Sequence, residues 1–110
     1  MTVGTHLIKI KGTFDKKIWG YEDEWVNEIF KEYIKTKIKN EIDSHYNPNL
    51  EFVRIDDNKI EVWIYIKALS LNISRDIIEK WLIDHIHEDG IDIYDLEIEK
   101  MIFGENYVRT

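Results

Sequence analysis

Apolar residues in this chain recur with two different periods, and the order of these periods constrains the fold more than any other feature. Some segments alternate apolar and polar residues, which is the pattern of half-buried β-strands; they are 5–13, 50–55, 60–67 and 92–103. Other segments repeat apolar residues every three or four positions, as amphipathic helices do; they are 21–44 and 74–88. The predicted order is strand, helix, strand, strand, helix, strand.

That order is typical of a ferredoxin-like βαββαβ sandwich, an α+β fold. We expect a four-stranded antiparallel sheet with two helices on one face. The chain of 110 residues is predicted to form a single domain, with 1–4 and 104–110 as tail-like ends. Folds of this kind carry many unrelated functions, so the architecture alone does not define an activity.

The second and third strands predict a hairpin in which residue 55 pairs with residue 60. Continued along both strands, the same register pairs 52 with 63 and 50 with 65. The aliphatic residues then share one sheet face, which we expect the helices to cover. The opposite face collects larger and more aromatic side chains, namely Leu50, Phe52, Trp63 and Tyr65.

The second helix and the last strand have predictable boundaries. Ser74 is expected to be the N-cap of the helix, and Gly90 its C-terminal stop. In the last strand, alternation places Tyr94 on the same side as Leu96 and Ile98.

The acidic residues of the last strand lie on the other side from its aliphatic ones. Glu97 and Glu99 share that side, and the first strand presents Lys9 and Lys11 on its matching outer face. In the expected fold these two strands are neighbours. We therefore predict a ladder of cross-strand ion pairs between them.

Charge is distributed unevenly along the chain. Residues 1–55 hold nine basic and nine acidic side chains, whereas residues 56–110 hold six and thirteen, which accounts for the whole net charge of −7. Phosphate backbones repel such a surface, so general binding of nucleic acids is not expected. No apolar run approaches the ~20 residues of a membrane span, the start does not resemble a signal peptide, and there is no cysteine. These features favour a cytoplasmic protein without membrane contact.

The common catalytic patterns do not occur in this sequence. The serines Ser44, Ser70 and Ser74 lie in no nucleophile elbow, and the glycines form no phosphate-binding loop. His85 and His87 are two positions apart on a helix, so they point to different faces and do not match the spacing of a metal-binding pair. We therefore predict no catalytic residues, no metal site and no cofactor.

The aromatic residues of the uncovered sheet face indicate a function best. Free monomers rarely expose a contiguous apolar patch, and Trp and Tyr act as anchors of protein interfaces. We predict a small acidic, non-enzymatic protein-binding module that self-associates as a homodimer through this face. A regulator or inhibitor that docks on a basic protein surface is one version of it. The expected binding residues are Leu50, Phe52, Trp63, Tyr65, Glu97 and Glu99.

Three alternatives remain open on the sequence alone. One is an enzyme whose site is assembled from scattered Asp, Glu and His residues. Another is an RNA-binding domain that stacks bases on Trp63 and Tyr65, although its third strand lacks the glycine expected of RNA recognition motifs. In the last, a tail segment such as Phe103–Tyr107 folds back over the sheet face.

Overall fold

The computed structural model of the protein describes residues 4–15 and 23–101. Its regular elements follow the predicted order of strand, helix, strand, strand, helix, strand. They are β1 (Gly4–Phe14), α2 (Asp23–Glu41), β2 (Asn49–Asp56), β3 (Lys59–Ala68), α3 (Leu71–Trp81) and β4 (Ile91–Lys100).

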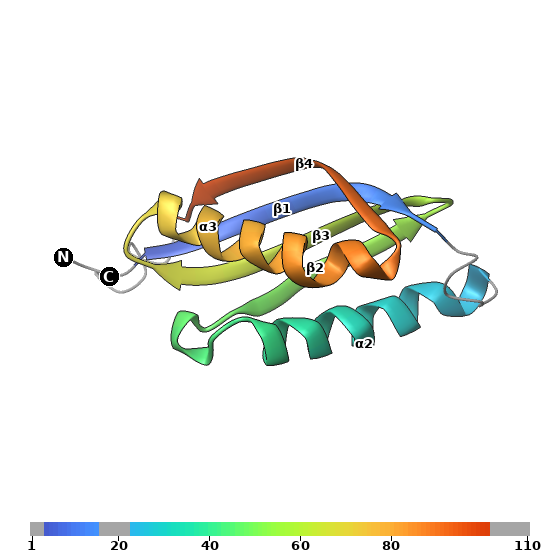
Figure 1. Ribbon diagram of the computed structural model, residues 1–110, viewed down its shortest axis with the longest axis horizontal. Coiled ribbons are helices and arrows are strands. Elements are labelled where there is room, and N and C mark those ends of the chain that lie inside the picture. The colour runs from blue at the N-terminus through green and yellow to red at the C-terminus, as the bar shows by residue number, and fades with distance from the viewer. Residues whose placement is uncertain (1–3, 16–22, 102–110) are drawn as a thin grey trace, which may run out of the picture.

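The four strands form one sheet in the order β2-β3-β1-β4, and every neighbouring pair is antiparallel. Figure 1 shows both α-helices on the same side of this sheet. Helix α2 contacts β2, whereas α3 contacts β3 and β4. The expectation of an α+β structure with a four-stranded antiparallel sheet and two helices is confirmed.

The core lies between the sheet and the helices. Alternation along the two central strands sends Ile8 and Ile10 of β1, and Ile64 of β3, to the helix side, where each is at most 1% exposed. Helix α2 adds residues spaced four apart to the same cluster, including Phe30 and Ile34, which are fully buried. The remaining buried apolar residues of the sheet and helices join the same cluster: Ile38, Ile42, Ile55, Ile60, Val62, Ile66, Ala68, Ile78, Trp81, Leu82, Ile86 and Ile91.

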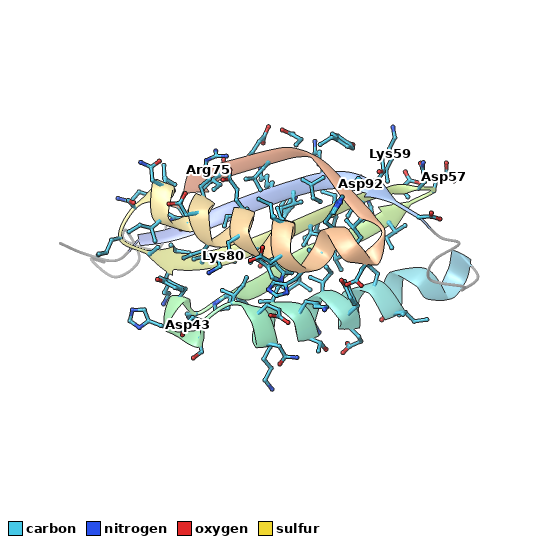
Figure 2. The ribbon with its side chains drawn as sticks, viewed as in Figure 1. Asp43, Asp57, Lys59, Arg75, Lys80 and Asp92 are labelled. Atoms are coloured by element: carbon cyan, nitrogen blue, oxygen red, sulfur yellow. The ribbon has the colours of Figure 1, made fainter. Side chains whose placement is uncertain are left out.

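The β2–β3 hairpin has the predicted register at its turn. Ile55 pairs with Ile60, and the two-residue loop places Asp57 in the left-handed region with φ of 59°; Figure 2 labels Asp57 at this tip. The predicted pairing of 50 with 65 is wrong, because a bulge between Leu50 and Phe52 places Leu50 opposite Ile64. One extra residue in a strand moves every residue beyond it to the opposite sheet face. Leu50 therefore lies on the helix side and packs against the core.

A second bulge interrupts β4. Lys11 pairs with Asp95 and Gly12 with Ile93, so Tyr94 is the extra residue. Tyr94 is 61% exposed, while Leu96 and Ile98 pack against the core, so of the three residues predicted to share a side Tyr94 does not join the core. Gly12 is required here, since a Cβ on it would lie 2.5 Å from the carbonyl oxygen of Asp92.

The ends of the elements differ from the predictions in several places. Strand β4 begins at Ile91 and ends at Lys100; Met101 is not part of it, and the rest of the predicted extension to Phe103 lies outside the described residues. Helix α2 ends at Glu41 rather than at 44, and a 3₁₀ turn follows it at Ser44–Tyr46. Within residues 4–15 and 23–101, neither helix combines the length and the apolar character that a membrane span requires.

The second helix begins one turn before the predicted position. Ser70, not Ser74, is the N-cap, because its extended backbone lets its Oγ accept a hydrogen bond from the Ile73 N–H at 3.2 Å. After Trp81 the helix continues as a π-helical turn, Leu82–Ile86, and a 3₁₀ turn, His87–Asp89. Gly90, with φ of 81°, ends it as predicted.

Candidate functional site

The candidate site is the sheet face opposite the two helices, called the open face below. The strand registers align its side chains in three rows, each crossing the sheet in the order β2, β3, β1, β4. The first row is Asn49, Tyr65, Leu7 and Glu99; the second is Phe52, Trp63, Lys9 and Glu97; the third is Arg54, Glu61, Lys11 and Asp95.

An aromatic pair forms the centre of the second row. The ring centroids of Phe52 and Trp63 are 5.1 Å apart, with 52° between the ring planes. The Nζ of Lys9 lies 4.7 Å from the centroid of the Trp63 ring, within the range of a cation–π contact. Phe52 remains 36% exposed and Trp63 is half-buried. The rings are thus ordered by their neighbours and still accessible in part.

Polar contacts hold this aromatic pair in place. The Nε1–H of Trp63 donates a hydrogen bond of 2.7 Å to Oε2 of Glu61. The other carboxylate oxygen of Glu61 lies 3.5 Å from Nη2 of Arg54 on the neighbouring strand. Because the only polar atom of the Trp63 side chain has a partner, the ring can be covered by another surface without leaving a buried donor unsatisfied.

The predicted ion ladder between β1 and β4 is confirmed for one pair. The Nζ of Lys9 lies 3.7 Å from Oε1 of Glu99, and the register places Glu97 directly opposite Lys9 on the same face. The Glu99 side chain is more than half exposed, so this single ion pair contributes little to stability. The carboxylates of Asp95, Glu97 and Glu99, called the acidic column of β4 below, therefore border the open face. Lys9 and Lys11 of β1 neutralise part of their charge.

The first row is the most apolar part of the open face. Leu7 stands opposite Tyr65 and is only 5% exposed, although it points away from the helices. Burial raises the pKa of the Tyr65 hydroxyl, and the nearby carboxylates of Glu51 and Glu99 raise it further. Tyr65 is consequently a neutral hydrogen-bonding group at the edge of an apolar surface.

The structure brings together most of the predicted binding residues. Phe52, Trp63 and Tyr65 lie on the open face, as do Glu97 and Glu99. Leu50 does not, because the β2 bulge turns it toward α2. There it lines a depression of about 350 Å³ together with Ile38 and Ile42. Leu7 of β1, instead of Leu50 of β2, is the aliphatic residue beside Tyr65 on the open face. The alternation of Leu7 with the core residue Ile8 could have identified it from the sequence.

A separate polar seam joins α2 to the end of the second helix. The Tyr33 hydroxyl donates a hydrogen bond to Asp89, and Lys37 Nζ lies 3.8 Å from the same carboxylate. Four residues further along α2, Glu41 lies 3.2 Å from Nε2 of His85. Burial first, and the Asp89 contact second, hold the pKa of Tyr33 well above its usual value. This seam fixes the two helices relative to each other.

Histidines and carboxylates do not gather into a metal site in the part of the chain that the structure describes. There, no group of three His, Cys, Asp or Glu side chains has the geometry to hold a metal ion. His85 faces Glu41, whereas His87 contacts Asp92 at 3.4 Å, so the two point in different directions.

One serine–histidine contact could not be seen in the sequence. Nδ1 of His6 lies 2.6 Å from Oγ of Ser74, 68 positions away, and both residues are at most 2% exposed. Burial lowers the pKa of His6, and the charge of Lys100 lowers it further. A substrate cannot reach a hydroxyl that is fully buried, so the pair fastens α3 to β1 and does not form a hydrolytic site.

Comparison of the chain with family models, with curated proteins and with solved structures finds no match to any of them. Function is therefore inferred from the geometry and charge of the open face.

Proposed function

We propose that the protein is a non-enzymatic protein-binding module with a ferredoxin-like fold, and that its open face binds a second copy of the chain. The observation that carries the proposal is the ordered Phe52–Trp63 pair beside Tyr65 and Leu7, on the sheet side away from both helices. Aromatic residues with satisfied polar atoms are the usual anchors of protein interfaces.

The strand order supports the fold assignment. Two central strands, β3 and β1, are flanked by β2 and β4, and the elements alternate as in a split βαβ arrangement. Helices on one side of such a sheet leave the other side to meet a partner.

The sheet edges support face-to-face rather than edge-to-edge association. The two edge strands are β2 and β4, and each carries a bulge, next to Leu50 and at Tyr94 respectively. Bulges interrupt the row of backbone donors and acceptors that a further strand needs for pairing. A partner is therefore expected to cover side chains of the open face.

Charge favours a protein over a nucleic acid as the partner. The whole chain carries a net charge of −7, and Asp95, Glu97 and Glu99 form an acidic border of the open face. Lys9 Nζ also lies 4.7 Å from the centroid of the Trp63 ring, so that ring is already in contact with a side chain of its own chain. These features disfavour a base-stacking surface.

Sedimentation velocity over a range of protein concentrations tests the proposal. We expect the wild type to dimerise, and the double substitution Trp63→Ala with Tyr65→Ala to weaken the dimer while the far-ultraviolet circular dichroism stays unchanged. Ile83→Ala is the matched control, because Ile83 is an apolar side chain that is 71% exposed and belongs to the π-helical turn.

Two results would contradict the proposal. A wild type that remains monomeric at every concentration excludes self-association. Tight, salt-sensitive binding of random oligonucleotides, measured by fluorescence anisotropy, would instead favour the base-stacking alternative.

A further inference from the structure

We infer that the two copies pair face to face about a two-fold axis that runs parallel to the strands, between β1 and β3. Strand β2 of one copy then lies over β4 of the other, and β3 lies over β1. The inference rests on the proposed self-association of the open face and adds the geometry of that dimer.

Symmetry determines which residues meet in such a dimer. A two-fold axis parallel to the strands leaves the position along a strand unchanged and reverses the order of the strands. Each of the three rows of the open face therefore meets the same row of the second copy, read in the opposite direction. Which side chains face each other then follows from the strand registers alone.

The third row is self-complementary in charge when it is reversed. Arg54 of one copy faces Asp95 of the second copy, and Glu61 faces Lys11. Both contacts occur twice because of the symmetry, which gives four pairings of opposite charge. The Arg54 side chain is 59% exposed, so it is able to reach across an interface in addition to its contact with Glu61.

The other two rows are compatible with the same axis. In the second row, Trp63 faces Lys9 of the second copy, an ammonium group near an indole ring as already occurs within one copy at 4.7 Å, and Phe52 faces Glu97. In the first row, Tyr65 faces Leu7, and the Asn49 amide faces the Glu99 carboxylate, so no like charges meet there. The first row has one charged side chain and the third row has four, so the two ends of the contact differ in character.

Three other simple axes place like charges against each other. An axis perpendicular to the strands lays every strand over its own copy, so the acidic column of β4 would meet itself. An axis parallel to the strands but centred on β1 sets Lys9 and Lys11 against their own copies, and one centred on β3 does the same for Glu61. Repulsion of this kind is a common means of excluding wrong arrangements.

The charge balance and the geometry of sheet packing allow this contact. The three rows hold three basic and four acidic side chains, a net charge of −1 against −7 for the whole chain. Aligned sheets cross at about 30°, which displaces the outer strands by roughly 4 Å, about half of the ~7 Å between rows. Long side chains such as Arg54 and Lys11 span that displacement.

Charge reversal of one contact tests the axis. In a dimer of the Arg54→Glu variant, the new carboxylate faces the Asp95 carboxylate of the second copy. In a dimer of the Asp95→Arg variant, the new guanidinium faces the Arg54 guanidinium of the second copy. We expect each variant alone to dimerise about tenfold more weakly than the wild type, as removal of a close charge pair does. An equimolar mixture of the two variants should recover the wild-type affinity, because both contacts in the mixed dimer again join opposite charges.

The control reverses a charge pair of the same size elsewhere. Arg75 and Glu79 form an i,i+4 ion pair at 3.6 Å on α3, and Figure 2 labels Arg75 on that helix. Arg75→Glu and Glu79→Arg should leave dimerisation unchanged, alone and mixed. Sedimentation velocity measures the affinities, and thermal melts at one protein concentration confirm that each variant is folded.

The outcomes separate the axis from the proposed function. If the wild type dimerises and Trp63→Ala with Tyr65→Ala weakens the dimer, but Arg54→Glu and Asp95→Arg do not prefer each other, the axis is wrong and self-association through the open face stands. If the wild type is monomeric, both proposals are wrong.

Discussion

Truncation of Ile64 to Ala is the most direct perturbation of the core that faces the helices. Ile64 is fully buried in the central strand β3, between Leu50 of β2 and Ile8 of β1. The substitution removes three carbon atoms, worth about 2.4 kcal/mol at ~0.8 kcal/mol each. A void of ~80 Å³ that does not collapse adds about 2 kcal/mol.

At the position of Ile64, both contributions to the loss of stability are expected nearly in full. Hydrogen-bonded strands on both sides keep the backbone from moving inward, so we expect a loss of about 4 kcal/mol. For a chain of this length that corresponds to a fall in melting temperature of roughly 15 °C.

Urea unfolding at one protein concentration, followed by circular dichroism, measures the loss. Lys67→Ala is the matched control, because Lys67 is an exposed residue of the same strand and its side chain lies on the opposite sheet face from Ile64. We expect a lower midpoint for Ile64→Ala, an unchanged slope, and almost no shift for Lys67→Ala. Equal stability of the two variants would refute the assignment of the sheet faces.

Two further outcomes follow from close contacts of β1. The pKa of buried His6 lies below its ordinary value of 6.5, so the unfolded state binds the proton first, and stability should be lost as the pH falls below about 6.5. His6→Gln should reduce that slope in urea midpoints measured between ~pH 7.5 and ~pH 5; an identical slope would contradict the role of His6. Gly12→Ala should cost about 1–3 kcal/mol in the same assay, because its Cβ would meet the Asp92 carbonyl oxygen. An unchanged midpoint would show that the β4 bulge accommodates a methyl group.

Much of the open face was predictable because it depends on alternation over short distances. Trp63 and Tyr65 lie on the same β3 face as expected, and Phe52 pairs with Trp63 in the predicted register. Leu50 was misplaced because the bulge that precedes Phe52 reverses the phase of alternation, and nothing in the local pattern of β2 marks it.

The seam and the His6–Ser74 pair were beyond prediction for a different reason. Tyr33 and Asp89 are separated by 56 positions, and His6 and Ser74 by 68. Their contacts depend on how the helices pack on the sheet. Ser74 illustrates the consequence, since it has the chemistry of an N-cap but is used as a buried partner of His6, while Ser70 caps the helix.

The sequence by itself determined the order of the elements, the faces of β1 and β3, the turn of the β2–β3 hairpin and the end of the second helix at Gly90, because each depends on residues near one another in the chain. Only the tertiary structure decided the side of Leu50, the exposure of Tyr94 at its bulge and the alignment of charges across the open face. Those features depend on the relative shift of strands distant in sequence, and a single extra residue in one strand changes that shift without altering its composition.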